Sequence, residues 1–218
     1  MLKNAFAVVA LASSFLLTPS AFSAVVLSGD IILSDPPPLS ADHDALESSQ
    51  HAFFWQEQQG VVVNDPFFVT IINPDGLYDS GNAATEATWG GKLSAGTYDS
   101  YYFHADKQGS NVTFNGSITF DTEIVGIIYK QTELDDTDEM FGAIGTTYSG
   151  GGSGRIYELD GANNWFSVSA DGKTLNFQTV VAHNMDDMRI LVSPVPVPAS
   201  IWFFASALVG LMGVKRRQ

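Results

Sequence analysis

The chain has 218 residues, with 24 Asp and Glu against 10 Lys and Arg, a net charge of −14 and no cysteine. This length suits one medium-sized domain with ends attached, and the lack of cysteine excludes disulfide scaffolds, Cys-ligated metal centres and thiol nucleophiles. The acidic balance argues against nucleic acid as a partner, because its phosphates require clustered Lys and Arg.

Residues 1–23 have the pattern of a secretory signal peptide. Lys3 gives a short basic start, the apolar run 5–17 follows, and a Thr-Pro-Ser break precedes small residues. The run is shorter than the about 20 residues that a membrane span needs, and signal peptidase accepts small side chains. We therefore expect export through the Sec machinery and cleavage in the region of Ala21, Ser23 and Ala24.

The next stretch predicts a linker and then a helix. The prolines of Asp35–Pro38 favour an extended backbone. Ser40 is a suitable N-cap, so Ser40 to Gln50 is expected to form one short helix.

Residues 24–193 predict an all-β domain, an antiparallel β-sandwich of jelly-roll-like type. Apolar and β-branched runs recur at short intervals between turn residues, which is typical of such folds. The expected strands are Gly60–Val63, Phe67–Ile72, Thr97–His104, Asn111–Phe114, Ser117–Phe120, Ile124–Tyr129, Arg155–Leu159, Trp165–Ser169, Thr174–Val181 and Met188–Val192.

Two dipeptides predict tight hairpins within this domain. Asn115-Gly116 lies between 112–114 and 117–120, and Asp171-Gly172 lies between 165–169 and 174–181. Both dipeptides accept the positive φ values of primed two-residue turns.

The run Asp135–Glu139 is the densest group of charges. Alternate oxygens at Asp136 and Asp138 are candidate calcium ligands, because Ca²⁺ prefers several carboxylates. The run has neither the sixth-position glycine nor the distal glutamate of an EF-hand loop. A solvated acidic loop is the favoured interpretation.

One predicted strand carries a histidine and an aspartate on the same face. If 97–106 is extended, His104 and Asp106 share a face with Ser100 and Tyr102. A His-x-Asp pair can bind a metal or act as a base, but a hydrogen-bonded strand histidine is favoured, because His43, His51 and His183 show no partner spacing.

Aromatic residues allow two interpretations. Tyr98, Tyr101, Tyr102 and Phe103, or Trp89, can stack on sugar rings. The interpretation that these rings belong to the core is favoured.

No catalytic constellation stands out. A Gly-x-Ser-x-Gly elbow is missing, and the many acids single out no glycosidase-type carboxylate pair. We therefore expect neither enzyme activity nor a cofactor.

The C-terminus, residues 194–218, combines three features in a fixed order. A proline-rich motif comes first, the uncharged apolar stretch 199–214 follows as an expected transmembrane helix, and a basic cluster closes the chain. The residues concerned are Val195, Pro196, Val197, Pro198 and Ala199, then Trp202, Phe203, Gly210 and Gly213, then Lys215, Arg216 and Arg217.

These residues closely resemble the PEP-CTERM sorting signal of exosortase-dependent Gram-negative bacteria, with Val197 where the family name implies glutamate. The resemblance implies that the precursor is held transiently in the inner membrane until exosortase cleaves near the proline motif. The passenger then reaches the cell surface or exopolysaccharide matrix.

The passenger also resembles a type often found ahead of such tails, in stretches such as Trp55–Val61, Gly96–Ser100 and Gly116–Asp121. That type has no assigned activity, so it implies a fold and no mechanism. We expect a non-catalytic matrix protein that contacts polysaccharide or other matrix proteins. The alternatives are a carbohydrate-active enzyme and a calcium-dependent carbohydrate-binding module delivered by the same route.

Overall fold

The structure is a computed structural model, and it describes residues 24–80, 91–107, 109–150, 154–160, 163–182 and 184–194. These residues fall within one compact unit, Ser23–Val195. The expected signal peptide, the sorting motif from Val195 onward, the stretch 199–214 and Trp89 lie outside the described residues. Within the described part, no helix is long and apolar enough to span a membrane.

The described part is mostly β-sheet, which confirms the predicted β-rich class. One sheet has five strands, all antiparallel to their neighbours. Its order is β1 (Val25–Gly29), β10 (Val112–Phe120), β14 (Thr174–Val181), β13 (Trp165–Val168) and β7 (Gly76–Tyr78).

The second sheet has six strands and carries the site described below. Its order is β2 (Ile31–Leu33), β4 (Ala52–Val63), β9 (Gly96–Ala105), β15 (Asp186–Val192), β11 (Ile124–Ile128) and β6 (Ile71–Ile72).

Two short sheets complete the strands, β3 (Ser40–Ala41) with β12 (Thr147–Tyr148), and β5 (Phe67–Val69) with β8 (Gly91–Leu93). The pairs β2–β4 and β12–β3 are parallel, which departs from the purely antiparallel expectation.

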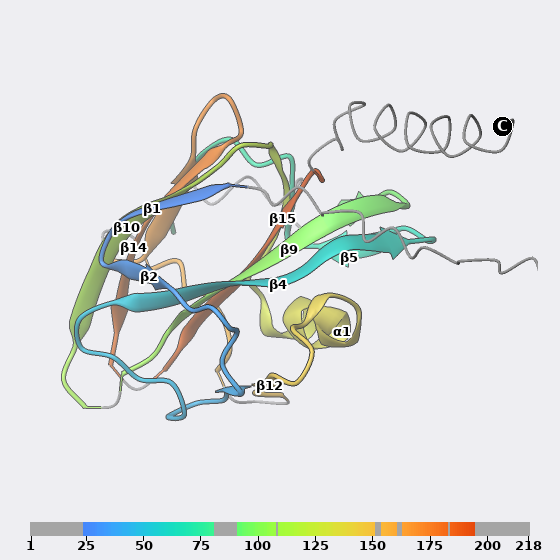
Figure 1. Cartoon of the computed structure of the whole chain (residues 1–218). Coiled ribbons are helices and arrows are strands. Elements are labelled where there is room, and N and C mark those ends of the chain that lie inside the picture. The colour runs from blue at the N-terminus through green and yellow to red at the C-terminus, as the bar shows by residue number, and fades with distance from the viewer. Residues whose placement is uncertain are drawn as a thin grey trace, which may run out of the picture. The chain divides into compact units, whose positions relative to one another are not determined.

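The two large sheets face each other across an aromatic core (Figure 1). Phe103 of β9 lies 4.8 Å from Phe177 of β14 between ring centroids, and Phe54 of β4 lies 6.1 Å from Phe120 of β10. Alternate residues of each strand point to this core, so the other face of each sheet needs separate cover.

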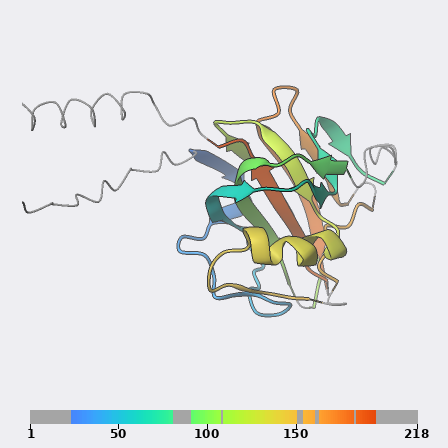
Figure 2. The ribbon, with the colours of Figure 1, turned by 90° about the vertical axis from the view of Figure 1, so that its right-hand side faces the viewer.

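The single described helix, α1 (Gln131–Phe141), supplies that cover for the six-stranded sheet (Figures 1 and 2). Its buried residues are Leu134, Thr137 and Phe141, which share one helical face. Leu134 and Phe141 pack with Trp55 and Tyr102 of the sheet in a second apolar cluster. Strand β9 is therefore buried on both faces over most of its length.

The helix predicted at Ser40 to Gln50 is wrong. The chain there forms β3 and turns, and the helix lies ninety residues later. Ser40 Oγ donates to Asp42 Oδ2 (3.0 Å) and accepts from the Asp42 amide (3.1 Å). Such local bonds from Ser and Asp compete with helix hydrogen bonding.

Of the two predicted hairpins, the one at Asp171-Gly172 forms, but through a longer loop than a primed two-residue turn, because Ser169 pairs with Thr174. The hairpin predicted at Asn115-Gly116 is wrong. Gly172 has a φ of +69° in the turn between β13 and β14. Gly116 instead lies in the middle of the continuous strand β10, opposite Phe177 of β14. A glycine suits that position because a Cβ there would lie 2.6 Å from Ser28 O and 2.9 Å from Phe177 Cζ.

Of the other predicted strands, some are confirmed and others are wrong or only partly matched. Five are confirmed to within a few residues, by β9, β11, β13, β14 and β15. Arg155–Leu159 is not a strand, and Phe67–Ile72 is split between β5 and β6. Gly60–Val63 is only the end of the twelve-residue strand β4.

We predict that Gly116→Ala destabilises the protein by about 1–3 kcal/mol, because the methyl group enters a packed site between two strands. Gly150→Ala is the matched control, since no described heavy atom lies within 4 Å of its Cβ position. Urea denaturation followed by circular dichroism measures both. Equal stability of the two variants would contradict the close packing at Gly116.

Candidate functional site

The outer face of the six-stranded sheet is built from alternate residues of three neighbouring strands. β9 contributes Tyr102 and His104, and β15 places Arg189 and Asp187 directly opposite them. Both β9 side chains lie against Trp55 of β4, which confirms that they share a face, as the sequence predicts. This register brings charged groups of two strands together under α1.

Arg189 is completely buried and bonds both within its own sheet and to α1. Its Nε and Nη2 donate to the two Glu57 oxygens at 2.7 and 2.8 Å, a bidentate pair within the sheet. Nη2 also donates to Asp138 Oδ1 (2.8 Å), and Nη1 donates to Thr137 Oγ1 (2.6 Å), both on α1. The guanidinium therefore joins β4 to the helix.

Arg155 is also completely buried and makes the second junction. Nη1 and Nη2 donate to Asp138 Oδ2 (2.5 Å) and Oδ1 (2.7 Å), and Nη1 reaches Asp135 Oδ1 at 3.1 Å. Its Nε donates to the Tyr102 hydroxyl at 2.6 Å. Arg155 therefore connects α1 to β9.

Asp187 extends these contacts along the sheet. The Tyr102 hydroxyl donates to Asp187 Oδ2 (2.8 Å), and Asp187 Oδ1 lies 2.7 Å from His104 Nδ1. His104 is thus a hydrogen-bonded strand histidine, as favoured from the sequence. We call Glu57, Asp138, Arg155, Asp187 and Arg189 the buried ionic network.

Electrostatics favour the charged form of both arginines. Burial alone would lower the pKa of each guanidinium, but the oxygens around it raise the pKa above its ordinary value. Burial and Asp187 in turn raise the pKa of Tyr102. Its hydroxyl therefore stays protonated and donates a hydrogen bond to Asp187. The network is held by charge-assisted hydrogen bonds.

The acidic run Asp135–Glu139 belongs to α1, so the predicted solvated loop is wrong. Leu134, Thr137 and Phe141 form the buried face of the helix. This face is hard to recognise in the sequence because acidic residues lie between them. Both oxygens of Asp138 accept bonds from arginine, while Asp136 is exposed on another side of the helix. The structure therefore does not bring the two candidate calcium ligands together.

The predicted aromatic residues are part of the core. Tyr98, Tyr101, Tyr102 and Phe103 are at most 9% exposed, too little for a sugar ring to stack on them. The core interpretation is confirmed for these four residues.

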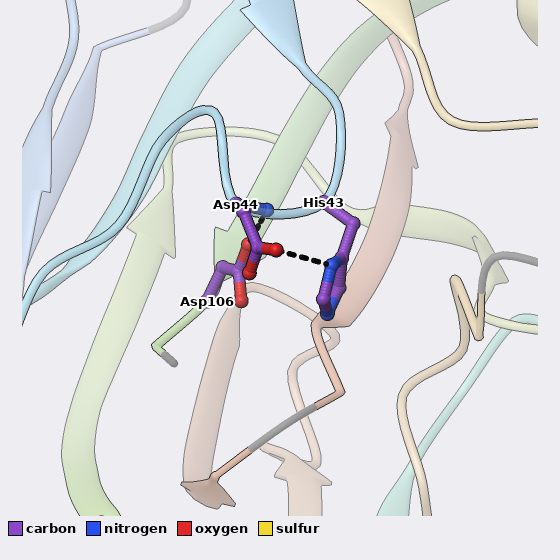
Figure 3. Close-up of side chains that lie close together, drawn as sticks. All are labelled: His43, Asp44 and Asp106. Atoms are coloured by element: carbon purple, nitrogen blue, oxygen red, sulfur yellow. Dashed lines mark hydrogen bonds and ion pairs between the residues drawn. The ribbon is translucent and has the colours of Figure 1, made fainter. Parts of the chain in front are cut away.

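A separate cluster lies beside the end of β9, where Asp106 meets the loop that follows β3 (Figure 3). One ligand-type atom each from His43, Asp44 and Asp106 lies within 4.8 Å of the others. His43 Nδ1 is 3.2 Å from Asp44 Oδ2, and the Asp44 amide donates to Asp106 Oδ2 at 2.6 Å. Asp44 has a φ of +63°, a conformation that Asp tolerates better than most residues.

Asp186 is a third buried acidic centre, next to Asp187 in sequence but on the core face. Its carboxyl accepts hydrogen bonds from the Thr179 hydroxyl and the Glu158 amide. Burial raises the pKa of Asp186 to about 8. These bonds tie Glu158 and Thr179 of β14 to Asp186 of β15 and indicate a structural role.

A shallow hollow of about 310 Å³ lies where two turns approach Glu123. It is lined by Asn73, Pro74, Asp75, Glu123, Ile124, Ala170, Asp171 and Gly172. Asp171 already accepts from Ser169 Oγ (2.5 Å) and the Lys173 amide (3.1 Å), so it acts as a turn residue.

Sequence reasoning did not single out Glu57, Arg155, Asp187 or Arg189, because they match no motif. One signal was present: Arg189 interrupts the apolar run from Met188 to Val192. An arginine inside a buried strand requires carboxylate partners. Comparison of the chain with protein-family models, curated proteins and solved structures gave no match.

We predict that Arg189→Met destabilises the protein by about 3–5 kcal/mol, because it leaves Glu57 buried without its cation. Adding Glu57→Gln to this variant is expected to recover part of the loss. Chemical denaturation of the single and double variants measures both effects.

Lys107→Met is the control, because Lys107 forms a partly exposed ion pair with Glu47 at 3.6 Å. Its loss is expected to cost less than about 1 kcal/mol. Similar losses for Lys107→Met and Arg189→Met would show that burial does not distinguish the two pairs.

Proposed function

We propose that the protein is a non-catalytic exported component of the cell surface or exopolysaccharide matrix, sorted through its C-terminal residues 194–218. One observation carries this proposal: a Pro-x-Pro motif, an apolar stretch and a basic terminus follow one another in that order. The three parts are Val195–Ala199, 199–214 and Lys215–Arg217.

Each part has a physical role in the proposed sorting. Pro196 and Pro198 fix an extended backbone, which suits the chain for entry into a transpeptidase cleft. The apolar stretch anchors the precursor in the inner membrane, and the basic cluster stays on the cytoplasmic side. Exosortase is the expected processing enzyme.

The proposed passenger is a jelly-roll-like β-sandwich. Its two large facing sheets support this part of the proposal. Residues 24–193 hold 24 acidic and six basic residues, a net charge of −18. Because both of their arginines are buried, only four lysines remain to offset the acids. Such a surface suits a soluble protein that approaches anionic polysaccharide only through bridging cations.

The carboxylates of the buried ionic network support the non-catalytic part of the proposal. Glu57, Asp138 and Asp187 each accept hydrogen bonds from an arginine or a tyrosine. A glycosidase would instead need two carboxyl groups facing a substrate across a cleft. The contacts of these three groups point to a role in folding.

The sorting proposal is tested by fusing residues 194–218 to a secreted reporter. In cells with exosortase we expect a shorter reporter, released from the membrane. In matched cells without the enzyme we expect the full-length fusion in the membrane fraction. Mass spectrometry of both fractions measures the difference.

A proline variant sharpens this test. The pair Pro196→Ala and Pro198→Ala is expected to block cleavage, whereas Pro194→Ala, just outside the motif, is the matched control. A reporter of the same mass in both cell types would refute exosortase processing.

A further inference from the structure

We propose that His43, Asp44 and Asp106 bind a divalent cation of the zinc class at the end of β9. This site is independent of the sorting proposal, because all three residues lie within the described passenger. It is distinct from the calcium candidates Asp136 and Asp138, and it shares only Asp106 with the His104–Asp106 pair that the sequence suggested.

The first argument is proximity. One nitrogen or oxygen from each residue lies within 4.8 Å of the other two, which leaves room for one ion between them (Figure 3). Zinc bonds to imidazole nitrogen and carboxylate oxygen at about 2.0–2.2 Å. The three ligand atoms therefore need to move only slightly toward a shared ion.

The second argument is an unsatisfied carboxylate oxygen. Asp106 is 1% exposed, and its Oδ1 has no hydrogen-bond partner among the described residues. Burying such an oxygen costs free energy unless a proton or a cation neutralises it. Burial also raises the pKa of Asp106, which reflects the same cost. A cation bound at Oδ1 removes this free-energy cost.

The third argument is that the ligands are already held in place. The Asp44 amide fixes Asp106 Oδ2, and the His43 amide donates to Ser149 Oγ at 2.8 Å. The Ser48 amide donates to the Asp106 carbonyl at 3.1 Å. These bonds leave the unpartnered oxygen Asp106 Oδ1 unused, so ion binding does not require the loop to refold. Such supporting bonds orient ligands in metal sites.

The ligand set selects the metal. Calcium prefers six to eight oxygens, whereas an imidazole with two carboxylates suits zinc and similar ions. The His43 and Asp44 side chains are 32% and 41% exposed, so an ion can enter from solvent. Three protein ligands also leave a fourth zinc position open to water or to an oxygen of an external ligand.

The test is calorimetric titration of the full chain, purified in detergent without a polyhistidine tag, with ZnCl₂. We expect saturable binding of one Zn²⁺ per chain. At zinc concentrations about a hundredfold above Kd, the melting temperature is expected to rise by about 5–10 °C. CaCl₂ and MgCl₂ at equal concentration are expected to give no comparable rise.

His43→Ala and Asp106→Asn are each expected to weaken zinc binding at least about tenfold, since each removes a ligand. His51→Ala is the matched control, because His51 lies outside the cluster. His43 is partly exposed, so its variant tests the site even if Asp106→Asn fails to fold.

Three results would overturn the proposal: no saturable zinc binding, zinc binding that His43→Ala leaves unchanged, or calcium binding without zinc binding.

Discussion

Two arginines without access to water place the strongest constraint on this structure. Arg155 and Arg189 are the only arginines of residues 24–193, and both are fully buried. A buried guanidinium is tolerated only where oxygens surround it in good geometry. Glu57, Asp138, Asp187 and Tyr102 supply those oxygens, and they come from β4, α1, β15 and β9. The network thereby fixes how these four elements meet.

This constraint also explains the position of the proposed cation site. His104 connects Asp187 of the network to the end of β9, and Asp106 follows two residues later. A strand held by the network on one side offers a rigid support for a ligand at its end. The loop with His43 and Asp44 then completes the cluster, so one strand serves folding along its length and ligand binding at its end.

The strands with clear periodicity were predictable, and the elements that depend on distant partners were not. Thr174–Val181 alternates apolar and polar residues and matches β14. Gly116 looked like a turn residue, but the need to accommodate Phe177 explains it better. Helix α1 was not predicted, because Asp138 has its buried partners, Arg155 and Arg189, 17 and 51 residues away in the sequence. For the site, the sequence paired His104 with Asp106 on one face, but only the fold brings His43 and Asp44 to Asp106.

Amide hydrogen exchange in α1 tests most directly whether the buried ionic network holds the helix on the sheet. The informative pair is Asp138→Asn, which loses its charge beside both arginines, and Asp136→Asn, which makes the same change at an exposed position of the same helix. We predict that Asp138→Asn speeds exchange of Gln131–Phe141 at least about tenfold while β14 stays protected, and that Asp136→Asn does not. Equal exchange of α1 in the two variants would contradict the account.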